Sequence, residues 1–123
     1  MHVNLKRENG KAVMLERIRE DISCVFGRDP AARHALDAAN ILPDEIDLVI
    51  VATSTPEHFF PSTASLVQDA IGARNAGAFD LSAACTGFVY ALAVGSQAIQ
   101  ASTMDTVIVI GSETLSKFVN WQD

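Results

Sequence analysis

The chain has 123 residues, which is enough for one domain with a modest hydrophobic core and too few for two. Its 49% hydrophobic and 20% charged residues are typical of a soluble globular protein. A net charge of -6 without a basic cluster argues against nucleic acid or an anionic membrane as a partner. Two cysteines do not make a disulfide framework and no apolar leader follows Met1, so we expect a cytoplasmic protein.

The first part of the chain predicts helices. Apolar residues recur at helical spacing over Lys11–Phe26, which indicates an amphipathic helix. A second helix is expected to open at Asp29-Pro30, with the aspartate as its cap, and to stop at Asn40. We therefore treat residues 1–30 as a separate, divergent and mainly helical segment before the main domain at residues 31–123.

The main domain alternates helices with strands. Runs of branched residues predict three interior strands, at Ile46–Ala52, Ala76–Leu81 and Thr106–Gly111. Apolar segments between them predict helices at Ser62–Ile71 and Cys85–Ala101. This alternation makes an α/β layer fold, with helices packed on a mostly parallel sheet.

Active residues of such folds gather at the carboxyl ends of the strands. Three candidates fall there: the Thr53–Pro61 loop, Cys85 and the Ser112–Thr114 turn. The stretch Leu81–Met104 contains no charged residue, but serine, threonine, glycine and glutamine interrupt it, so we do not interpret it as a transmembrane helix. Its helix is apolar nearly all round and is expected to be buried on most faces.

Cys85 is the candidate nucleophile. It follows a run of small residues, Ser82-Ala83-Ala84, and opens the predicted helix. The free N–H groups and positive dipole end of a helix start favour thiolate, which is the reactive form of cysteine. On these grounds alone a small buried cysteine in an alanine-rich core is the alternative. We interpret Cys24 as structural.

Four segments in order carry a wider pattern. They are Asp47–Pro56, Phe60–Ala64, Ala78–Phe88 and Val109–Ser116. Together they resemble the amino-terminal half of β-ketoacyl-ACP synthase III, a condensing enzyme of the thiolase superfamily. The resemblance covers residues from about 31 to 123 and implies one partial half of a thiolase-like layered fold.

The resemblance implies a mechanism and a site. Cys85 would take an acyl group from acyl-CoA, and the enolate formed by decarboxylation of malonyl-ACP would attack the resulting thioester to initiate fatty acid biosynthesis. Phe60, Thr86 and Phe88 would contact the substrate, with Phe60 reaching across the interface of a homodimer. That interface would use the strand Ala76–Leu81. No metal and no cofactor is expected beside the acyl-CoA and acyl carrier protein substrates.

Three nearby residues are not assigned to the chemistry. Gly87 is expected to let the helix pack closely against its neighbours. His58 is set aside because the family's catalytic histidine lies in the other half. Glu113 stays open between a solvated or capping carboxylate and a site residue.

Departures from the family limit what the chain should do. The family's catalytic histidine and asparagine lie in its carboxyl-terminal half, so the chain alone is expected not to complete condensation. No basic surface for the acidic carrier protein is evident. The family also opens with a glycine-containing strand between the strands matching Ile46–Ala52 and Thr106–Gly111. Either His2–Leu5 or Val13–Leu15 replaces that strand, or the fold is incomplete.

Two alternatives remain at this point. The chain could be a non-catalytic half that pairs with a complementary chain, or with itself, through exposed sheet edges. Within the enzyme class, polyketide-forming and HMG-CoA-type synthases are relatives. The Ala83–Phe88 setting and the Phe60–Ser62 segment favour synthase III.

Overall fold

A computed structural model describes residues 5–7, 10–17, 24–120 and 122 of the chain. This part contains five strands, three α-helices and three short 3-10 turns. In chain order they are β1 (Leu5–Arg7), β2 (Gly10–Arg17), α1 (Cys24–Ala39), η1 (Pro43–Glu45), β3 (Leu48–Ala52), α2 (Thr63–Ile71), β4 (Gly77–Leu81), η2 (Ala84–Thr86), α3 (Gly87–Gln100), β5 (Val107–Gly111) and η3 (Leu115–Lys117).

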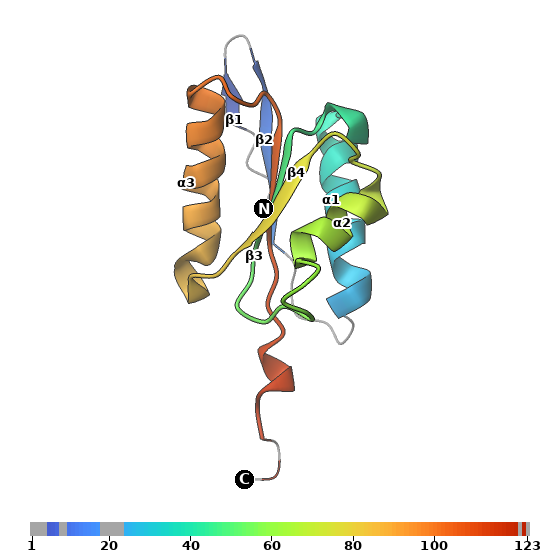
Figure 1. Ribbon diagram of the computed structural model, residues 1–123, viewed down its shortest axis with the longest axis vertical. Coiled ribbons are helices and arrows are strands. Elements are labelled where there is room, and N and C mark those ends of the chain that lie inside the picture. Colours follow the sequence, from blue (N-terminus) through green and yellow to red (C-terminus); the bar gives the residue numbers. More distant parts are fainter. Residues whose placement is uncertain (1–4, 8–9, 18–23, 121, 123) are drawn as a thin grey trace.

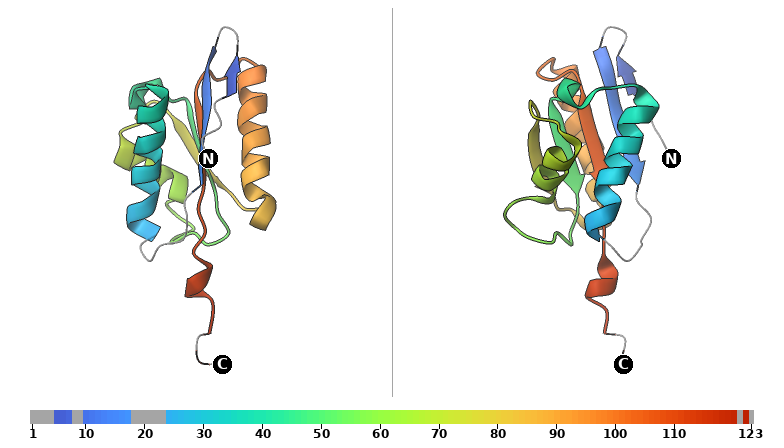
Figure 2. Two further views of the ribbon diagram at one scale, coloured as in Figure 1. Left: turned by 180° about the vertical axis from the view of Figure 1, so that it is seen from behind. Right: turned by 90° about the vertical axis from the view of Figure 1, so that its right-hand side faces the viewer.

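The strands form one sheet in the order β1-β2-β5-β3-β4. β2, β5, β3 and β4 run parallel, and β1 pairs antiparallel with β2. Helices α1 and α2 cover one face of the sheet and α3 covers the other, as Figures 1 and 2 show. The expected α/β layer fold with a mostly parallel sheet is confirmed.

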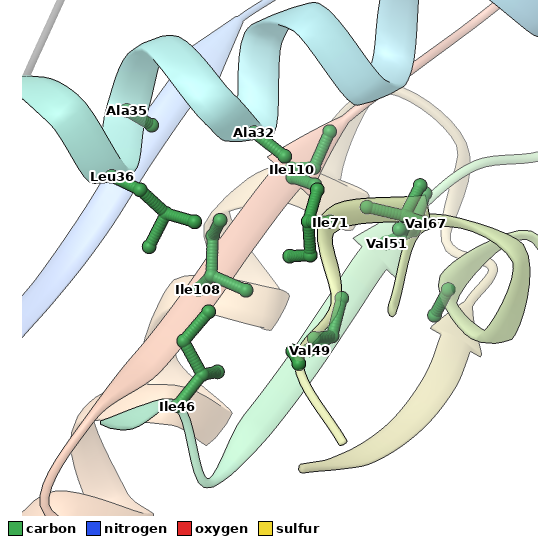
Figure 3. Close-up of a cluster of buried hydrophobic side chains, with 12 residues drawn as sticks. Ala32, Ala35, Leu36, Ile46, Val49, Val51, Val67, Ile71, Ile108 and Ile110 are labelled. Carbon is green, nitrogen blue, oxygen red and sulfur yellow. The ribbon is translucent and has the colours of Figure 1, made fainter. Parts of the chain in front are cut away.

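Alternate residues of the two central strands supply two separate cores, because successive side chains of a strand point to opposite faces. Val49 and Val51 of β3, with Ile108 and Ile110 of β5, face α1 and α2 (Figure 3). The other members of this core are Ala32, Ala35, Leu36, Ile46, Ala64, Val67, Ile71 and Ala73.

The core under α3 is smaller. Its buried residues are Leu48, Ile50 and Ala52 of β3, Val107 and Val109 of β5, and Ala91 and Ile99 of α3. A Cβ added to Gly95 would lie 3.1 Å from Cγ1 of Val107, which is closer than side chains normally approach. The glycine therefore lets α3 lie directly on β5.

The amino-terminal segment differs from the expectation. The predicted helix over Lys11–Phe26 is wrong for residues 10–17, which form β2, while residues 18–23 lie outside the described part. Pairing along β5 outweighs the helical periodicity of this segment, because packing in a sheet overrides weak local preference. α1 begins at Cys24 rather than at Asp29 and runs past residue 30, so the expected division there does not coincide with a break in the fold.

The expected strand between the two central strands is also wrong. β3 and β5 pair directly, from Leu48 opposite Val107 to Ala52 opposite Gly111. β2, which contains Val13–Leu15, lies on the other edge of β5. The backbone groups of β3 and β5 thus find partners without a strand between them.

Helix α3 also differs from its expectation. It starts at Gly87, two residues after Cys85, and only one of its faces is buried. The prediction that the helix is buried on most faces is wrong, because no other element of the described chain covers its outer side. None of the described helices is long and apolar enough to cross a membrane.

Candidate active site

The carboxyl ends of β3, β4 and β5 meet at one edge of the sheet. The register places Ala52 beside both Leu81 and Gly111. Hydrogen bonds extend this alignment beyond the strands: the Thr53 N–H donates to the Leu81 carbonyl at 3.0 Å, and the Ser112 N–H donates to the Ala52 carbonyl at 3.0 Å. The three candidate regions named from the sequence therefore lie together at the edge of the sheet where these strands end.

Cys85 lies in the tight turn between β4 and α3. It is a free thiol, and it is exposed. Ala84 before it has a φ of 47°, a left-handed conformation that costs an L-residue about 1 kcal/mol. The Thr86 hydroxyl donates to the Ala83 carbonyl at 2.8 Å, and the Thr86 N–H donates to the same carbonyl at 3.2 Å. This doubly bonded turn sets the thiol at the start of α3, open to solvent.

The N–H groups of this turn are partly used. The Gly87 N–H donates to the Ala84 carbonyl, as the Thr86 N–H does to that of Ala83. Two of the N–H groups that the sequence analysis expects to be free at the helix start thus serve the turn itself. The site accordingly depends on the fixed position of Cys85 more than on an open row of donors at the helix start.

Gly87 and Gly111 differ in how closely a neighbouring side chain packs against them. A Cβ added to Gly87 would lie 3.6 Å from the Cβ of Ala52, an ordinary contact, so the expected need for a glycine here is not severe. A Cβ added to Gly111 would lie 3.1 Å from Cδ2 of Phe88. Phe88 is half-buried against the core under α3. Substrate contact by Phe88 and Thr86 stays a prediction.

The loop that carries Phe60 projects from the molecule. Phe59 is 98% exposed and Phe60 is 93% exposed, and His58 is exposed as well. Aromatic side chains so fully in water lack a partner in the described chain, in keeping with a contact made elsewhere. The predicted role of Phe60 in a partner's acyl site stays a prediction.

Asp80 anchors the end of this loop, a role that the sequence analysis missed. Its carboxylate accepts hydrogen bonds from the N–H groups of Thr63 at 2.8 Å and Ala64 at 2.7 Å, at the start of α2. The Ser62 hydroxyl accepts another from the Ser65 N–H at 3.1 Å. The signal in the sequence is an acidic residue inside an apolar strand.

Glu113 joins the loops after β3 and β5. Its carboxylate accepts from the Ser54 N–H at 2.8 Å and from the Thr55 hydroxyl at 2.9 Å. The same Thr55 oxygen accepts from the Thr114 N–H at 2.8 Å. Of the two interpretations left open for Glu113, these bonds support a carboxylate that holds loops together.

The described residues include no group of three or more histidine, cysteine, aspartate or glutamate side chains that could hold a metal ion. Cys85 supplies an exposed thiol at this edge of the sheet. A thiolate suits acyl transfer, because it is both a good nucleophile and a good leaving group.

Known proteins share this arrangement. Residues 79–123, which include the Cys85 turn and α3, match the family model of 3-oxoacyl-[acyl-carrier-protein] synthase III. The solved structure of such a synthase from Aquifex aeolicus VF5 superposes with a TM-score of 0.79 at 43% identity, covering 92% of this chain and 36% of that one. The priming β-ketosynthase of the R1128 polyketide pathway gives 0.79 at 34% identity, covering 89% and 33%. The fold is thus that of the thiolase-like condensing enzymes.

Sequence similarity shows which kind of condensing enzyme the chain resembles. A β-ketoacyl-[acyl-carrier-protein] synthase III from Clostridium novyi (strain NT) is 57% identical over 93 residues, which are 76% of this chain and 29% of that protein. The one from Natranaerobius thermophilus is also 57% identical over 93 residues, 76% of this chain and 28% of that protein. The chain is similar to the amino-terminal portion of these β-ketoacyl-ACP synthases III, and it spans less than a third of their length.

Proposed function

We propose that Cys85 is the acyl-accepting thiol of a β-ketoacyl-ACP synthase III. The observation that carries the proposal is the exposed thiol on the bonded turn between β4 and α3, within the residues that match the synthase family. The thiolate attacks the carbonyl carbon of acyl-CoA, and the CoA thiolate leaves and takes up a proton. The product is an acyl thioester on Cys85.

The second step concerns the complete enzyme. Malonyl-ACP loses carbon dioxide, and its enolate carbon attacks the acyl thioester to give a β-ketoacyl-ACP and free Cys85. The proposal assigns the groups that promote decarboxylation to the portion of the relatives that this chain does not match. The substrates of the proposed enzyme are acyl-CoA and acyl carrier protein. We propose that it needs no further cofactor and lies in the cytoplasm.

The proposal includes a homodimer through β4. This strand lies at one edge of the sheet, with its outer backbone groups unpaired by another described strand. Such an edge can add a strand from a second copy. Phe79 on this strand is a large exposed apolar side chain, and Phe60 projects from a nearby anchored loop. In such a dimer Phe60, with Thr86 and Phe88, would contact the acyl substrate.

Mass spectrometry of the intact chain tests acyl transfer. After incubation with acetyl-CoA, we expect one acetyl adduct on the chain and on Cys24→Ala, and none on Cys85→Ala. Because both variants keep one cysteine, they are matched controls for nonspecific acetylation. An adduct that persists in Cys85→Ala, or its absence from the unmodified chain, would contradict the proposal.

A second candidate function is a non-catalytic pairing module, favoured by the same open β4 edge. Both candidates predict that the purified chain forms no β-ketoacyl product from acetyl-CoA and malonyl-ACP. Formation of the acetyl adduct on Cys85 distinguishes them, because only the enzymatic candidate requires it. Sustained β-ketoacyl synthesis by the chain alone would show that other residues replace the groups assigned to the unmatched portion.

A further inference from the structure

The Glu113 carboxylate is connected to the strand that precedes Cys85 by a row of three hydrogen bonds. The Thr55 hydroxyl donates to Oε2 of Glu113 at 2.9 Å, and the Thr55 N–H donates to the Thr53 hydroxyl at 3.1 Å. The Thr53 N–H in turn donates to the Leu81 carbonyl at 3.0 Å. Leu81 is the last residue of β4, and the turn that holds Cys85 follows it. The segments after β3 and β5 are therefore bonded to each other and to the end of β4.

The two threonines in this row are buried. Thr53 is 4% exposed and Thr55 is 7% exposed, and each hydroxyl oxygen has a hydrogen-bond partner. The Thr55 oxygen also accepts from the Thr114 N–H at 2.8 Å, and Oε1 of Glu113 accepts from the Ser54 N–H at 2.8 Å. Buried networks in which each hydroxyl is bonded hold their groups in one arrangement. The segments after β3 and β5 are accordingly fixed where they leave the sheet.

We propose that Glu113 is a positioning residue for acyl transfer to Cys85. This role rests on the proposed function and adds a residue to it. An acyl donor that reaches Cys85 lies over the segments after β3 and β5, since the register brings the ends of β3, β4 and β5 together (Figure 1). Fixed segments hold the carbonyl carbon of the donor close to the thiol, where a misplacement of about 1 Å can cost about 100-fold in rate. Glu113 acts through Thr55 and Ser54 and does not itself touch the reacting atoms.

Asp47 provides a matched control at the opposite end of the sheet. Its carboxylate, just before β3, accepts hydrogen bonds from the N–H groups of Asp105 at 2.8 Å and Thr106 at 2.9 Å, just before β5. It thus joins the same two strands by two hydrogen bonds, as Glu113 does, at the end away from Cys85. Because Asp47→Ala and Glu113→Ala remove comparable bonds, an effect of lost stability alone would appear in both variants.

The experiment measures acetyl adduct formation on the full chain at saturating acetyl-CoA by intact mass. We expect Glu113→Ala and Thr55→Val to lower the first-order rate about tenfold, and Thr55→Ser, which keeps the hydroxyl, to retain it. Asp47→Ala should retain it as well. Glu113→Gln keeps one accepting oxygen and should lose less, which provides a second variant where Glu113→Ala does not fold. The double variant of Glu113→Ala and Thr55→Val should be no slower than Glu113→Ala alone, because both changes remove the same link.

A small reagent separates positioning from access to the thiol. All variants are made with Cys24→Ala, which leaves Cys85 as the one cysteine of the chain. Iodoacetamide needs no bound position, so its rate of reaction with Cys85 should stay within about twofold of the parent rate in every variant. Circular dichroism confirms that each variant keeps its secondary structure.

The possible outcomes distinguish failure of this role from failure of the proposed function. A parent chain that takes up no acetyl group contradicts the proposed function and the role of Glu113 with it. Acetylation of the parent chain that proceeds equally fast in Glu113→Ala and Thr55→Val contradicts the role of Glu113 alone. Equal slowing by Asp47→Ala, or equal slowing of the iodoacetamide reaction, would show that the bonds of Glu113 stabilise the fold without positioning the donor.

Discussion

The two faces of the sheet are built from the same strands and are covered very differently. On one face, α1 and α2 enclose a core to which β3 and β5 contribute Val49, Val51, Ile108 and Ile110. On the other, α3 alone covers Leu48, Ile50, Val107 and Val109, and its own outer side stays exposed. Strand residues that are equally buried thus lie in a closed core on one side and in an open-sided layer on the other.

The largest predicted effect is the loss of stability when a buried isoleucine is truncated. It is compared between the two faces of the sheet, with one substitution on each. Ile108→Ala and Ile50→Ala each remove the same atoms from a fully buried position on neighbouring strands. We expect losses in unfolding free energy of about 4 kcal/mol for Ile108→Ala and about 3 kcal/mol for Ile50→Ala, because α3 can settle into the space more freely than two helices packed together. Urea denaturation of both variants measures the difference.

Equal losses of unfolding free energy in the two variants would contradict this difference between the faces. If Ile50→Ala costs as much as Ile108→Ala or more, then the core under α3 is as rigid as its counterpart. The layer under α3 would then be closed to the same degree as the core under α1 and α2.

A smaller effect is expected at Asp80, on the well-covered face. Asp80→Ala removes the acceptor of two N–H groups at the start of α2, and we expect it to lower the unfolding free energy by about 1–2 kcal/mol. Asp80→Asn keeps one acceptor and should lose less. Thermal denaturation measures both, with Asp37→Ala on exposed α1 surface as the control. Equal stability of Asp80→Ala and Asp37→Ala would exclude a capping role.

The smallest effects concern two glycines of α3. Alanine is the better helix former by about 1 kcal/mol. At Gly87 a Cβ finds ordinary contacts, so Gly87→Ala should stabilise the chain by roughly 0.5 kcal/mol. At Gly95 a Cβ meets Val107 at 3.1 Å, so the same change should destabilise by about 1 kcal/mol. Opposite shifts in melting temperature are the expected result, and shifts of the same sign would contradict the close packing at Gly95.

The interior of the fold could be predicted from sequence because its pattern is local. The run Ile46–Ala52 contains β3, every residue of which is buried, and Ser62 and Gly72 mark the two ends of α2 as their residue types suggest. Asn40 has a φ of 55°, the left-handed stop expected after α1. Cys85 follows a strand and precedes a helix, as its surroundings indicate.

The features that could not be predicted from the sequence depend on contacts between residues far apart in the chain. The apolar spacing over Lys11–Phe26 fits a helix, but residues 10–17 form a strand that pairs with β5. Asp80 and Glu113 accept hydrogen bonds from residues 16 and 59 positions away, so a local pattern does not identify their partners. The sequence of α3 shows that it is apolar nearly all round, but apolar composition does not show which elements are present to cover it.

Limiting alkylation most directly tests the central claim, that the turn between β4 and α3 makes Cys85 the reactive thiol of the chain. Cys24→Ala and Cys85→Ala are treated with less than one equivalent of iodoacetamide, and intact mass gives the labelled fraction of each. We expect Cys24→Ala to be labelled about tenfold faster than Cys85→Ala, because the Cys85 thiol is exposed at its turn and alkylation requires access to the thiol. Equal labelling of the two variants would contradict the claim.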